Sequence, residues 1–377
     1  MYKTDFIGKN QMKIGIVTYF NVPNYGAVLQ AYALQRYLQF RGHHIVFVDY
    51  AWGRGNFSLN QLLLSRVRKF VHKKLTHNRS STSFLSFQHF EKTKRYNTVV
   101  SILHDPLDCE CFIVGSDQMW ALSADRRHTF PLRFLDVFDH KALRIAYAVS
   151  FGKPVPKELS EEVGRYMQKF SAISVREKNT VEWVRDLSGR EAKWLCDPTL
   201  LLKSEYYDKL FPSDIPLDLS GAYIFKYILP WETVGDGILD GIEKHLGIAH
   251  IKTDMCYPNT WIDIVCGIRS KIEVEDWLQR IKYATFVITN SFHGTLFSII
   301  YKKPFLTLPL TGHAASMNDR IFSVLGFLGL EDRIYDASNS NYSLSKLLNS
   351  PINWTDVHLR LDNWRNQTDD YFRTLAL

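Results

Sequence analysis

The alternation of short apolar runs with longer amphipathic stretches constrains the fold of this chain more than any other feature. The runs KIGIVTY, HIVFVDY, CFIVG, RIAYAVS and AISV are typical of buried strands, and residues 25–40 have the pattern of a helix that ends near Gly42. Strands that alternate with helices form a mainly parallel sheet with helices packed on its faces. The expected fold class is therefore α/β.

A second series of the same kind follows a turn-rich stretch at residues 211–221. Its strand patterns lie at residues 222–228, 284–289 and 304–310, and its helical patterns at 235–246, 273–282, 292–301 and 318–328. We therefore expect an N-terminal domain at 12–210 and a C-terminal domain at 221–345, after a tail at 1–11 and before a C-terminal helix at 350–377 that returns to the N-terminal domain. Two doubly wound sheets in tandem bind ligands outside the carboxyl ends of their strands.

The positive charge is concentrated in one insertion. Of 377 residues, 46 are Lys or Arg and 39 are Asp or Glu, and the surplus of seven lies in residues 51–90, which contain no acidic residue. The rest of the chain is electrically neutral, which argues against a nucleic-acid-binding surface. Residues 61–79 have the pattern of an amphipathic basic helix, for which an anionic membrane surface is the expected partner. The alternative is a helix that packs on the fold with its basic face in solvent.

Cysteine usage and the N-terminus bear on the compartment and on metals. The sequence has five cysteines, an odd number, and no C-x-x-C motif. This argues against a disulfide framework and gives no indication of a metal site. Residues 1–11 lack the apolar core of a signal peptide, and no apolar run approaches the length of about 20 residues that spans a bilayer. We expect a cytoplasmic protein, at most peripheral on the inner face of the membrane, without a metal or cofactor.

Two predicted strand ends of the first domain carry small and polar residues. Asn24, Tyr25 and Gly26 begin the first helix, where free N–H groups and a glycine let a ligand approach the backbone. The alternative is an ordinary strand-to-helix turn. Ser116, Asp117 and Gln118 follow CFIVG, and Asp117 suits hydroxyl binding or proton abstraction. Here the alternative is that Asp117 caps the next helix.

Arginine and histidine occur at two further strand ends. Arg176 follows AISV and suits bidentate pairing with a carboxylate or phosphate, unless it only pairs with Glu177. In TNSFHGT, residues 289–295, Asn290 or Ser291 is the expected helix cap, which places His293 in the first helical turn. A histidine beside an anion-binding helix N-terminus can act as a general acid or base. The alternative is a histidine that makes only local hydrogen bonds.

The loop at residues 311–320 is a weaker candidate. It contains His313 and Arg320 among small residues, and it could close over a ligand above the second sheet. The alternative is that Asn318 or Asp319 simply caps the following helix.

Several of these segments, taken in order, resemble the polysaccharide pyruvyl transferase family. The matching segments are TYFNVPNYGAVLQAYAL, FIVGSDQMW, AISVRE, CDPTLLL, ITNSFHGTLFSIIYKKPF and NDRI, and the resemblance runs from about Lys13 to Leu330. It implies two Rossmann-like domains that face a cleft, as in GT-B glycosyltransferases, with the acceptor side in the first domain and the donor side in the second. It also implies transfer of a pyruvyl group from phosphoenolpyruvate, a co-substrate, to two hydroxyls of a bacterial capsule, exopolysaccharide or cell-wall glycan, free or lipid-linked.

The resemblance also implies roles for individual residues. His293 matches the family's catalytic histidine, and Arg176 matches the arginine that contacts phosphoenolpyruvate. The expected donor-binding residues are Arg176, Asn290, Ser291, Phe292, Gly294 and Arg320; the expected acceptor-binding residues are Asn24, Tyr25, Gly26, Ser116 and Gln118; Asp117 is the second catalytic candidate. Many relatives carry arginine at the position of Ser291, so here phosphate binding is expected to rely on backbone N–H groups, Arg176 or Arg320.

Two other functions are compatible with the same residues. One is a GT-B glycosyltransferase that uses a nucleotide-sugar, since a histidine at a helix N-terminus would serve there as well. The other is a non-catalytic assembly protein at the membrane surface, built on the same fold. Phosphoenolpyruvate should stabilise the native state of a pyruvyl transferase, whereas a nucleotide-sugar should stabilise a glycosyltransferase.

Overall fold

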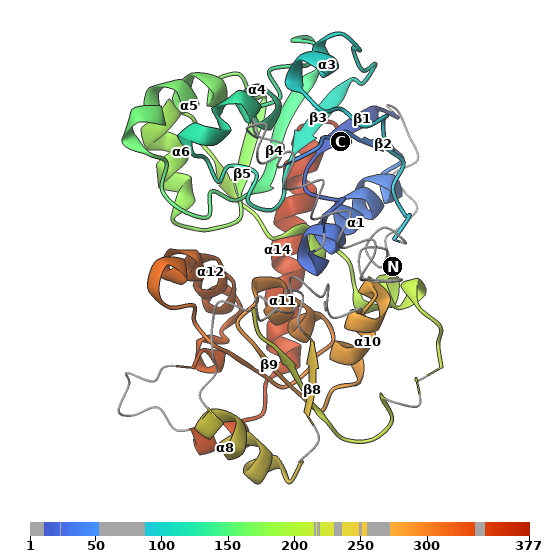
Figure 1. Cartoon of the computed structure of the whole chain (residues 1–377), viewed down its shortest axis with the longest axis vertical. Coiled ribbons are helices and arrows are strands. Elements are labelled where there is room, and N and C mark those ends of the chain that lie inside the picture. Colours follow the sequence, from blue (N-terminus) through green and yellow to red (C-terminus); the bar gives the residue numbers. More distant parts are fainter. Residues whose placement is uncertain are drawn as a thin grey trace, which may run out of the picture.

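The computed structural model describes residues 11–22, 24–52, 87–214, 216, 219–229, 236–248, 251–254, 272–335 and 344–377. These residues form two α/β units stacked one above the other, with a long helix running along both of them (Figure 1). The basic segment at residues 61–79 lies outside the described residues, so its predicted helix and membrane contact remain predictions.

The first unit contains a six-stranded parallel sheet in the order β2-β1-β3-β4-β5-β6. In chain order the strands are β1 Lys13–Val17, β2 His44–Phe47, β3 Cys111–Val114, β4 Leu143–Val149, β5 Ala172–Val175 and β6 Lys193–Trp194. The strand order reverses between β1 and β3, so the loops after these two strands diverge and leave a crevice at their carboxyl ends.

The second unit contains a four-stranded parallel sheet in the order β10-β9-β7-β8. Its strands are β7 Ile224–Tyr227, β8 Ile251–Asp254, β9 Phe286–Thr289 and β10 Phe305–Thr307. Here the order reverses between β7 and β9. Both sheets are parallel and doubly wound, which confirms the expected α/β class with two Rossmann-like sheets.

Helices separate the strands in both units. The α-helices are α1 Tyr25–Phe40, α3 Val99–Leu103, α4 Phe130–Arg133, α5 Ser160–Met167, α6 Thr180–Ser188, α7 Ser204–Tyr207, α8 Asp236–Leu246, α10 Val274–Tyr283, α11 Phe292–Ile300, α12 Asp319–Leu328, α13 Leu344–Asn349 and α14 Trp354–Thr374. Two 3₁₀ segments matter for the site, η3 Pro198–Leu201 and η6 Gly312–Asn318.

Helix α1 shows how local sequence sets these bounds. Asn24 is its N-cap, and the Asn24 side chain accepts a hydrogen bond from Ala27 N–H. Gly42 follows the helix with φ of 92°, a left-handed conformation that glycine adopts at low cost. Most of the helix is buried, which explains why its sequence is apolar on nearly every side.

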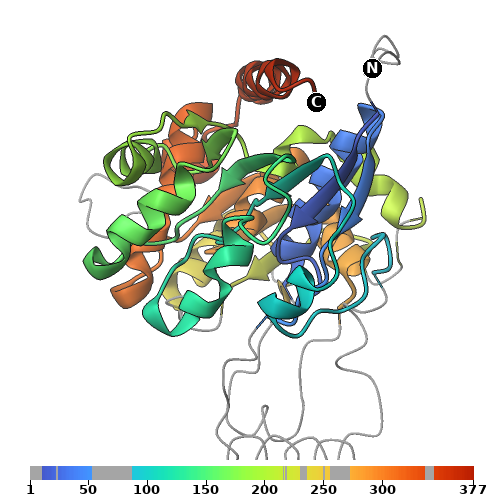
Figure 2. The same cartoon turned by 90° about the horizontal axis from the view of Figure 1, so that it is seen from above.

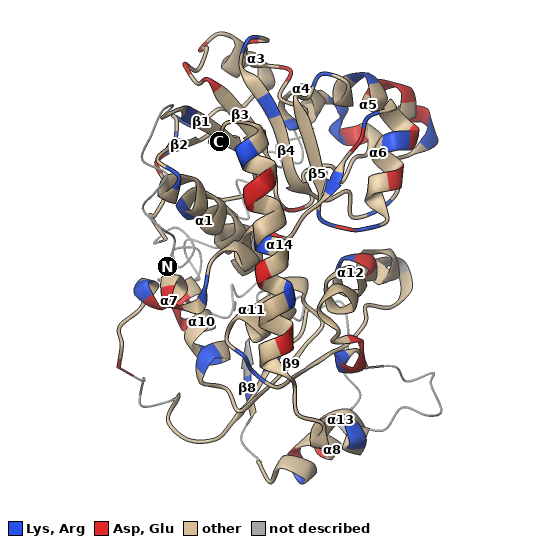
Figure 3. Ribbon diagram, turned by 180° about the vertical axis from the view of Figure 1, so that it is seen from behind, with Lys and Arg blue, Asp and Glu red and all other residues tan. Residues whose placement is uncertain are grey.

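The C-terminal helix α14 returns to the first unit, as expected. Arg365 donates hydrogen bonds to the carbonyls of Leu200 and Leu202, and Tyr37 of α1 donates one to Asp369. Viewed along its axis in Figure 2, α14 lies at the outer edge of the molecule, and Figure 3 shows charged residues spaced along it. The helix therefore fixes the two units against each other from the side.

The domain bounds expected from the sequence remain a prediction, although the change from one sheet to the other falls between Trp194 and Ile224. Within the described part of the chain, no helix combines the length and the apolar character that crossing a bilayer requires.

Candidate active site

The two strand-order reversals face one another across a cavity of about 440 Å³. Loops after β1 and β3 form one wall, and the ends of β7 and β9 form the other. The lining residues are Tyr19, Val22, Asn24, Ala27, Asp117, Gln118, Tyr227, Leu229, Ser291, Phe292, His293, Met317 and Arg320. Since ligands of doubly wound sheets bind at such reversals, this cavity is the candidate active site.

Helix α11 presents its N-terminus to the cavity. Ser291 is the N-cap, and its side chain accepts a hydrogen bond from Gly294 N–H at 3.3 Å. His293 therefore lies in the first turn, where backbone N–H groups are not used by the helix itself. Of the two caps predicted from the sequence, Asn290 and Ser291, the structure shows Ser291. Ser291 also lines the cavity.

The imidazole of His293 is fixed from both sides by the first unit. Its Nε2 lies 3.6 Å from Oδ2 of Asp197, which follows β6. On the other side the ring lies against Gly26 of α1, where an added Cβ would be 1.9 Å from Nδ1. A side chain at position 26 would therefore displace the imidazole. Gly26 serves the site by leaving room for His293.

Asp197 is completely buried and strongly bound. Its Oδ1 accepts hydrogen bonds from Thr199 N–H and Oγ1–H at 2.9 and 2.8 Å, and its Oδ2 accepts one from Arg176 Nη1 at 2.8 Å. Burial by itself raises the pKa of Asp197, but the nearby imidazole of His293 and the cation of Arg176 together outweigh it and hold that pKa well below the usual range. Asp197 is therefore a carboxylate.

Arg176 follows β5 and is also fully buried. It pairs with Asp197, with Glu177 at 3.3 Å and with Asp117 at 3.9 Å. Burial lowers its pKa, but these three carboxylates more than compensate and raise it above the ordinary value. Its Nη2 makes the pair with Asp117 and has no hydrogen-bond partner among the described residues, and its guanidinium stacks 4.4 Å from the ring of Phe292. The pairing with Glu177 that the sequence left open does occur.

Arg320, in the first turn of α12, lies over the same Phe292 ring at 5.6 Å, so the two arginines share one aromatic side chain. Burial and the nearby charge of Arg176 lower the pKa of Arg320 to about 10. Its Nε is buried without a hydrogen-bond partner in the described part of the chain. Arg320 lines the cavity, whereas Arg176 lies behind it. The arrangement leaves a cation at the cavity wall.

The loop after β3 contributes a second carboxylate. Asp117 lines the cavity, and its Oδ1 accepts a hydrogen bond from Gln118 N–H at 2.8 Å. Asp117 has φ of 62°, and the next helical segment begins only at Ala124, so it does not cap a helix. Gln118 lines the cavity as well, and its Nε2 reaches Met317 Sδ of the opposite unit.

Other predicted site residues lie behind the cavity wall. Tyr25 is fully buried, stacks on Trp277 at 5.0 Å and donates a hydrogen bond to the carbonyl of Ile272, so it packs one unit against the other. Ser116 is fully buried, and its hydroxyl donates to the carbonyl of Ala148. These placements indicate structural roles rather than contact with an acceptor. Asn24 does line the cavity, besides capping α1.

Two donor-side residues hold the second sheet together beneath α11. Asn290 Oδ1 accepts a hydrogen bond from Leu229 N–H at 2.7 Å, which joins the chain ends after β7 and β9. An added Cβ at Gly294 would lie 2.5 Å from Thr289 Oγ1, so only glycine allows α11 this close to β9. Both residues therefore position the N-terminus of α11.

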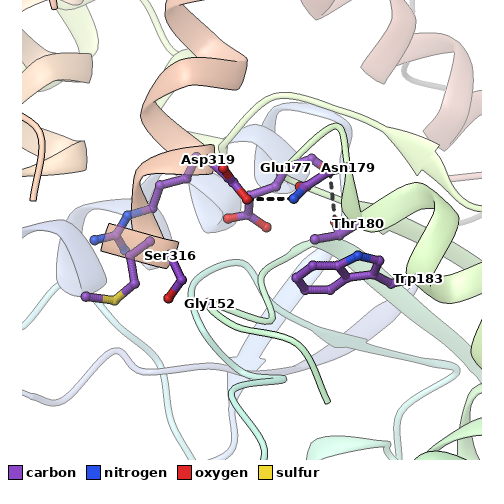
Figure 4. A pocket seen from close by; sticks show the side chains of 9 residues that line it. Gly152, Glu177, Asn179, Thr180, Trp183, Ser316 and Asp319 are labelled. Atoms are coloured by element: carbon purple, nitrogen blue, oxygen red, sulfur yellow. Dashed lines mark hydrogen bonds between the residues drawn. The ribbon is translucent and has the colours of Figure 1, made fainter. Parts of the chain in front are cut away.

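A smaller pocket adjoins the cavity through Met317 and Arg320, which line both. Figure 4 shows Glu177, Asn179 and Asp319 gathered near the indole of Trp183. Asn179 donates a hydrogen bond to Asp319 at 2.7 Å and so links α6 to α12 across the two units. Glu177 Oε2 and Asn179 Oδ1 are buried without hydrogen-bond partners among the described residues. This pocket can take one small hydrogen-bond donor.

Metal and loop candidates add little. The described residues contain no group of His, Cys, Asp or Glu arranged to hold a metal ion. The side chain of His313 lies outside the described part of the structure. Asn318 precedes α12, and its side chain bonds the backbone of Leu310 rather than capping the helix.

Sequence analysis did not single out Asp197, although it is the residue that joins Arg176 to His293. The available signal was an aspartate directly before a proline and just after a short strand, in CDPTLLL. Nothing local in that segment indicates which distant side chains its carboxylate meets.

Comparisons with known proteins agree with this site at the level of the family. A family model for polysaccharide pyruvyl transferase matches residues 24–310, well over half of the chain. The match includes α1, the loop after β3, Arg176, Asp197 and the N-terminus of α11. No curated protein sequence matches the chain.

Solved structures are similar to this chain over nearly its whole length. An α-glucosyltransferase in complex with UDP is 9% identical, with a TM-score of 0.48, and the match covers 94% of each chain. A UDP-GlcNAc 2-epimerase from Neisseria meningitidis bound to UDP-GlcNAc is 11% identical, with a TM-score of 0.46, covering 94% of this chain and 93% of the other. Likenesses this distant say nothing of what this chain binds.

Proposed function

This chain belongs to the polysaccharide pyruvyl transferase family, and we propose that it transfers the pyruvyl group of phosphoenolpyruvate to two hydroxyls of one glycan sugar. The product is a cyclic pyruvate ketal on a bacterial capsule, exopolysaccharide or cell-wall polysaccharide. One observation carries the proposal beyond the family: His293, Arg320 and the N-termini of α1 and α11 meet at one cavity between the two sheets.

The cavity suits a small anion with a reactive double bond. Arg320 at the wall and free N–H groups of two helix N-termini attract phosphate or carboxylate. Arg176 lies behind this wall, paired with Asp197, Glu177 and Asp117. With Ser291 used as a helix cap, Arg320 is the side chain that takes the phosphate, which fits the neutral residue at position 291.

The reaction proceeds in two additions at C2 of phosphoenolpyruvate. His293 donates a proton to the methylene carbon, which becomes a methyl group and leaves an oxocarbenium-like centre at C2. An acceptor hydroxyl attacks C2 and loses its proton to Asp117. The C2–O bond to phosphate then breaks, and phosphate leaves with the bonding electrons. A second hydroxyl of the same sugar attacks C2, passes its proton to the now neutral His293 and closes the ketal ring, and the departing phosphate takes the proton from Asp117.

The acceptor approaches from the wall formed by the first unit. Asn24, Asp117 and Gln118 line the cavity there, opposite His293 and Arg320. Amide and carboxylate side chains of this kind hydrogen-bond sugar hydroxyls. Gln118 and Asn24 therefore orient the acceptor, while Asp117 accepts a proton from it.

The proposal is tested by incubating the protein with phosphoenolpyruvate and a panel of galactosides, mannosides and lipid-linked oligosaccharides, and by measuring the release of phosphate. Thermal unfolding with phosphoenolpyruvate, and separately with nucleotide-sugars, distinguishes the glycosyltransferase alternative, because a ligand of the native state raises the unfolding temperature. Stabilisation by a nucleotide-sugar alone would overturn the proposal. Liposome binding without phosphate release for any acceptor would favour the assembly protein.

We also propose that the basic segment at residues 61–79 holds the enzyme at an anionic membrane that carries a lipid-linked acceptor. The proposal rests on the positive charge of this segment, which the donor site does not use because the proposed donor-binding residues all lie outside it. Replacing Arg66, Arg68, Lys69, Lys73 and Lys74 by Gln should weaken binding to phosphatidylglycerol vesicles, by about 1 kcal/mol per residue. Turnover of a water-soluble acceptor should not change. Unchanged vesicle binding would show that the segment is only a solvated face.

A further inference from the structure

The carboxylate of Asp197 is held in a fixed plane between the two units. Thr199 saturates Oδ1 with two hydrogen bonds, one from its N–H and one from its hydroxyl. The side chain of Asp197 is fully buried, so water does not compete for the other oxygen. Only Oδ2 remains to interact with the rest of the site.

Three donors surround Oδ2, but one of them is already engaged. Arg176 Nη1 donates to it at 2.8 Å. Ser116 Oγ lies at 3.4 Å, yet its single hydrogen is directed to the carbonyl of Ala148 at 2.7 Å. One lone pair of Oδ2 is therefore left for His293, whose Nε2 lies at 3.6 Å.

His293 has matching unused capacity. Its Nε2 is buried and has no hydrogen-bond partner among the described residues. On the Nδ1 side the ring packs closely against Gly26, where even a single added carbon would overlap it. The imidazole is thus confined between Gly26 and Asp197, with Nε2 facing the carboxylate.

We propose that Asp197 is a positioning residue: it accepts a hydrogen bond from Nε2–H of His293, which fixes the orientation of the ring and leaves Nδ1 as the nitrogen that exchanges a proton with the substrate. The two atoms need to approach by about 0.5 Å to reach ordinary hydrogen-bond length. Such bonds commonly tighten only when the substrate is bound. Because Asp197 and His293 come from different units, the acid is complete only while the units are together.

The inference rests on the proposed function only for the use of the His293 proton. A purely structural alternative exists, since Asp197 also neutralises the buried Arg176. The two roles differ in one respect. A positioning residue acts through His293, whereas a neutralising residue affects the protein whether or not His293 is present.

A double-mutant cycle separates the roles. Asp197→Asn should lower kcat by about 100-fold or more, the usual contribution of acid–base catalysis. In the presence of His293→Gln the same substitution should cost almost nothing further, because its effect is already lost. If the two substitutions instead lowered kcat by independent factors that multiply in the double mutant, the positioning role would be overturned. Tyr207→Phe is the matched control, since the Tyr207 hydroxyl bonds the carbonyl of Thr199 without touching the carboxylate.

A spectroscopic measurement tests the same contact without relying on transfer activity or on the folding of a variant. In ¹⁵N-histidine-labelled wild-type protein, with the His293 signals assigned by comparison with His293→Gln, the neutral ring should carry its proton on Nε2. A neutral ring protonated on Nδ1 would overturn the inference. If the wild type transfers no pyruvyl group but shows the Nε2–H form, the proposed function fails while this contact stands.

Discussion

Arg176 and Arg320 stack against the same phenylalanine ring, yet they are opposite in their surroundings. Arg176 comes from the first unit, is fully buried and pairs with three carboxylates, and its pKa is raised. Arg320 comes from the second unit, has its pKa lowered to about 10 and has a buried Nε without a partner among the described residues. Burial alone therefore does not distinguish the two arginines. We propose that Arg320, whose charge at the cavity wall is less compensated, is the one that binds the donor.

The same contrast holds for the two walls as a whole. In the first unit, Asp197 and Arg176 are paired to each other in the absence of any ligand. In the second unit, His293 and Arg320 each retain a buried nitrogen without a partner among the described residues. We infer that the first wall is a preformed support and that the second wall supplies the groups that meet the donor.

The largest expected effect is on stability, from removing Arg176. Arg176→Gln leaves Asp197 and Glu177 buried without their cation, so the free energy of unfolding should fall by about 3–5 kcal/mol. Urea denaturation measures it. Arg185→Gln, at an exposed position, is the control and should change stability by less than about 0.5 kcal/mol. A stability loss below about 1 kcal/mol would break the comparison.

Arg320→Gln should show the reverse pattern. The free energy of unfolding should change little, because the folded protein holds this cation at a cost. The affinity for phosphoenolpyruvate should fall by about 1.5–3 kcal/mol, the worth of a charged hydrogen bond, as measured by isothermal titration calorimetry. Arg360→Gln, in an exposed pair with Asp356, is the matched control. Unchanged affinity would show that Arg320 does not hold the donor.

Gly26→Ala tests how the two walls meet. The new methyl group overlaps the imidazole of His293, so the ring must move or the units must separate. We expect a stability loss of about 1–3 kcal/mol together with loss of turnover. Gly326→Ala is the control, because its added Cβ meets only Glu331 Oε1 at 3.7 Å in the middle of α12. Full activity in Gly26→Ala would contradict the placement of His293.

The smallest effect is the pH dependence that the buried carboxylate imposes. The folded-state pKa of Asp197 is lowered, so its contribution to stability is fully present above the unfolded-state pKa of about 3.9 and is lost as pH falls toward the folded-state value. The difference in unfolding free energy between wild type and Asp197→Asn should therefore be constant from pH 6 to 8 and should narrow below about pH 4. If the difference in unfolding free energy between the two proteins grew at low pH, the pKa of Asp197 would not be lowered in the folded state.

Much of the fold was predictable because it depends on local patterns. The strand AISV at Ala172–Val175 and the helix at Tyr25–Phe40 agree with their predicted bounds. Strand β8 was not predicted: Ile251–Asp254 is short and half polar, as an edge strand can be. Its pairing with β7 makes this segment a strand, although its own sequence does not indicate one.

The site was predictable only in part, and for a physical reason. His293 at a capped helix N-terminus and Arg176 at a strand end follow from local sequence. Whether a side chain faces the cavity depends on how the units pack, so Tyr25 and Ser116 looked like acceptor ligands but are buried. Asp197 was missed because its partners come from distant parts of the chain.

The central claim is that this site moves a pyruvyl group from phosphoenolpyruvate onto a glycan. The most direct measurement combines phosphate release with mass spectrometry of the acceptor, for wild type and for folded His293→Ala. The account predicts one phosphate for each pyruvylated product with wild type, and a fall of about 100-fold or more in the rate of both with His293→Ala. Equal activity in His293→Ala, or no pyruvylated product with any member of a broad acceptor panel, would contradict it.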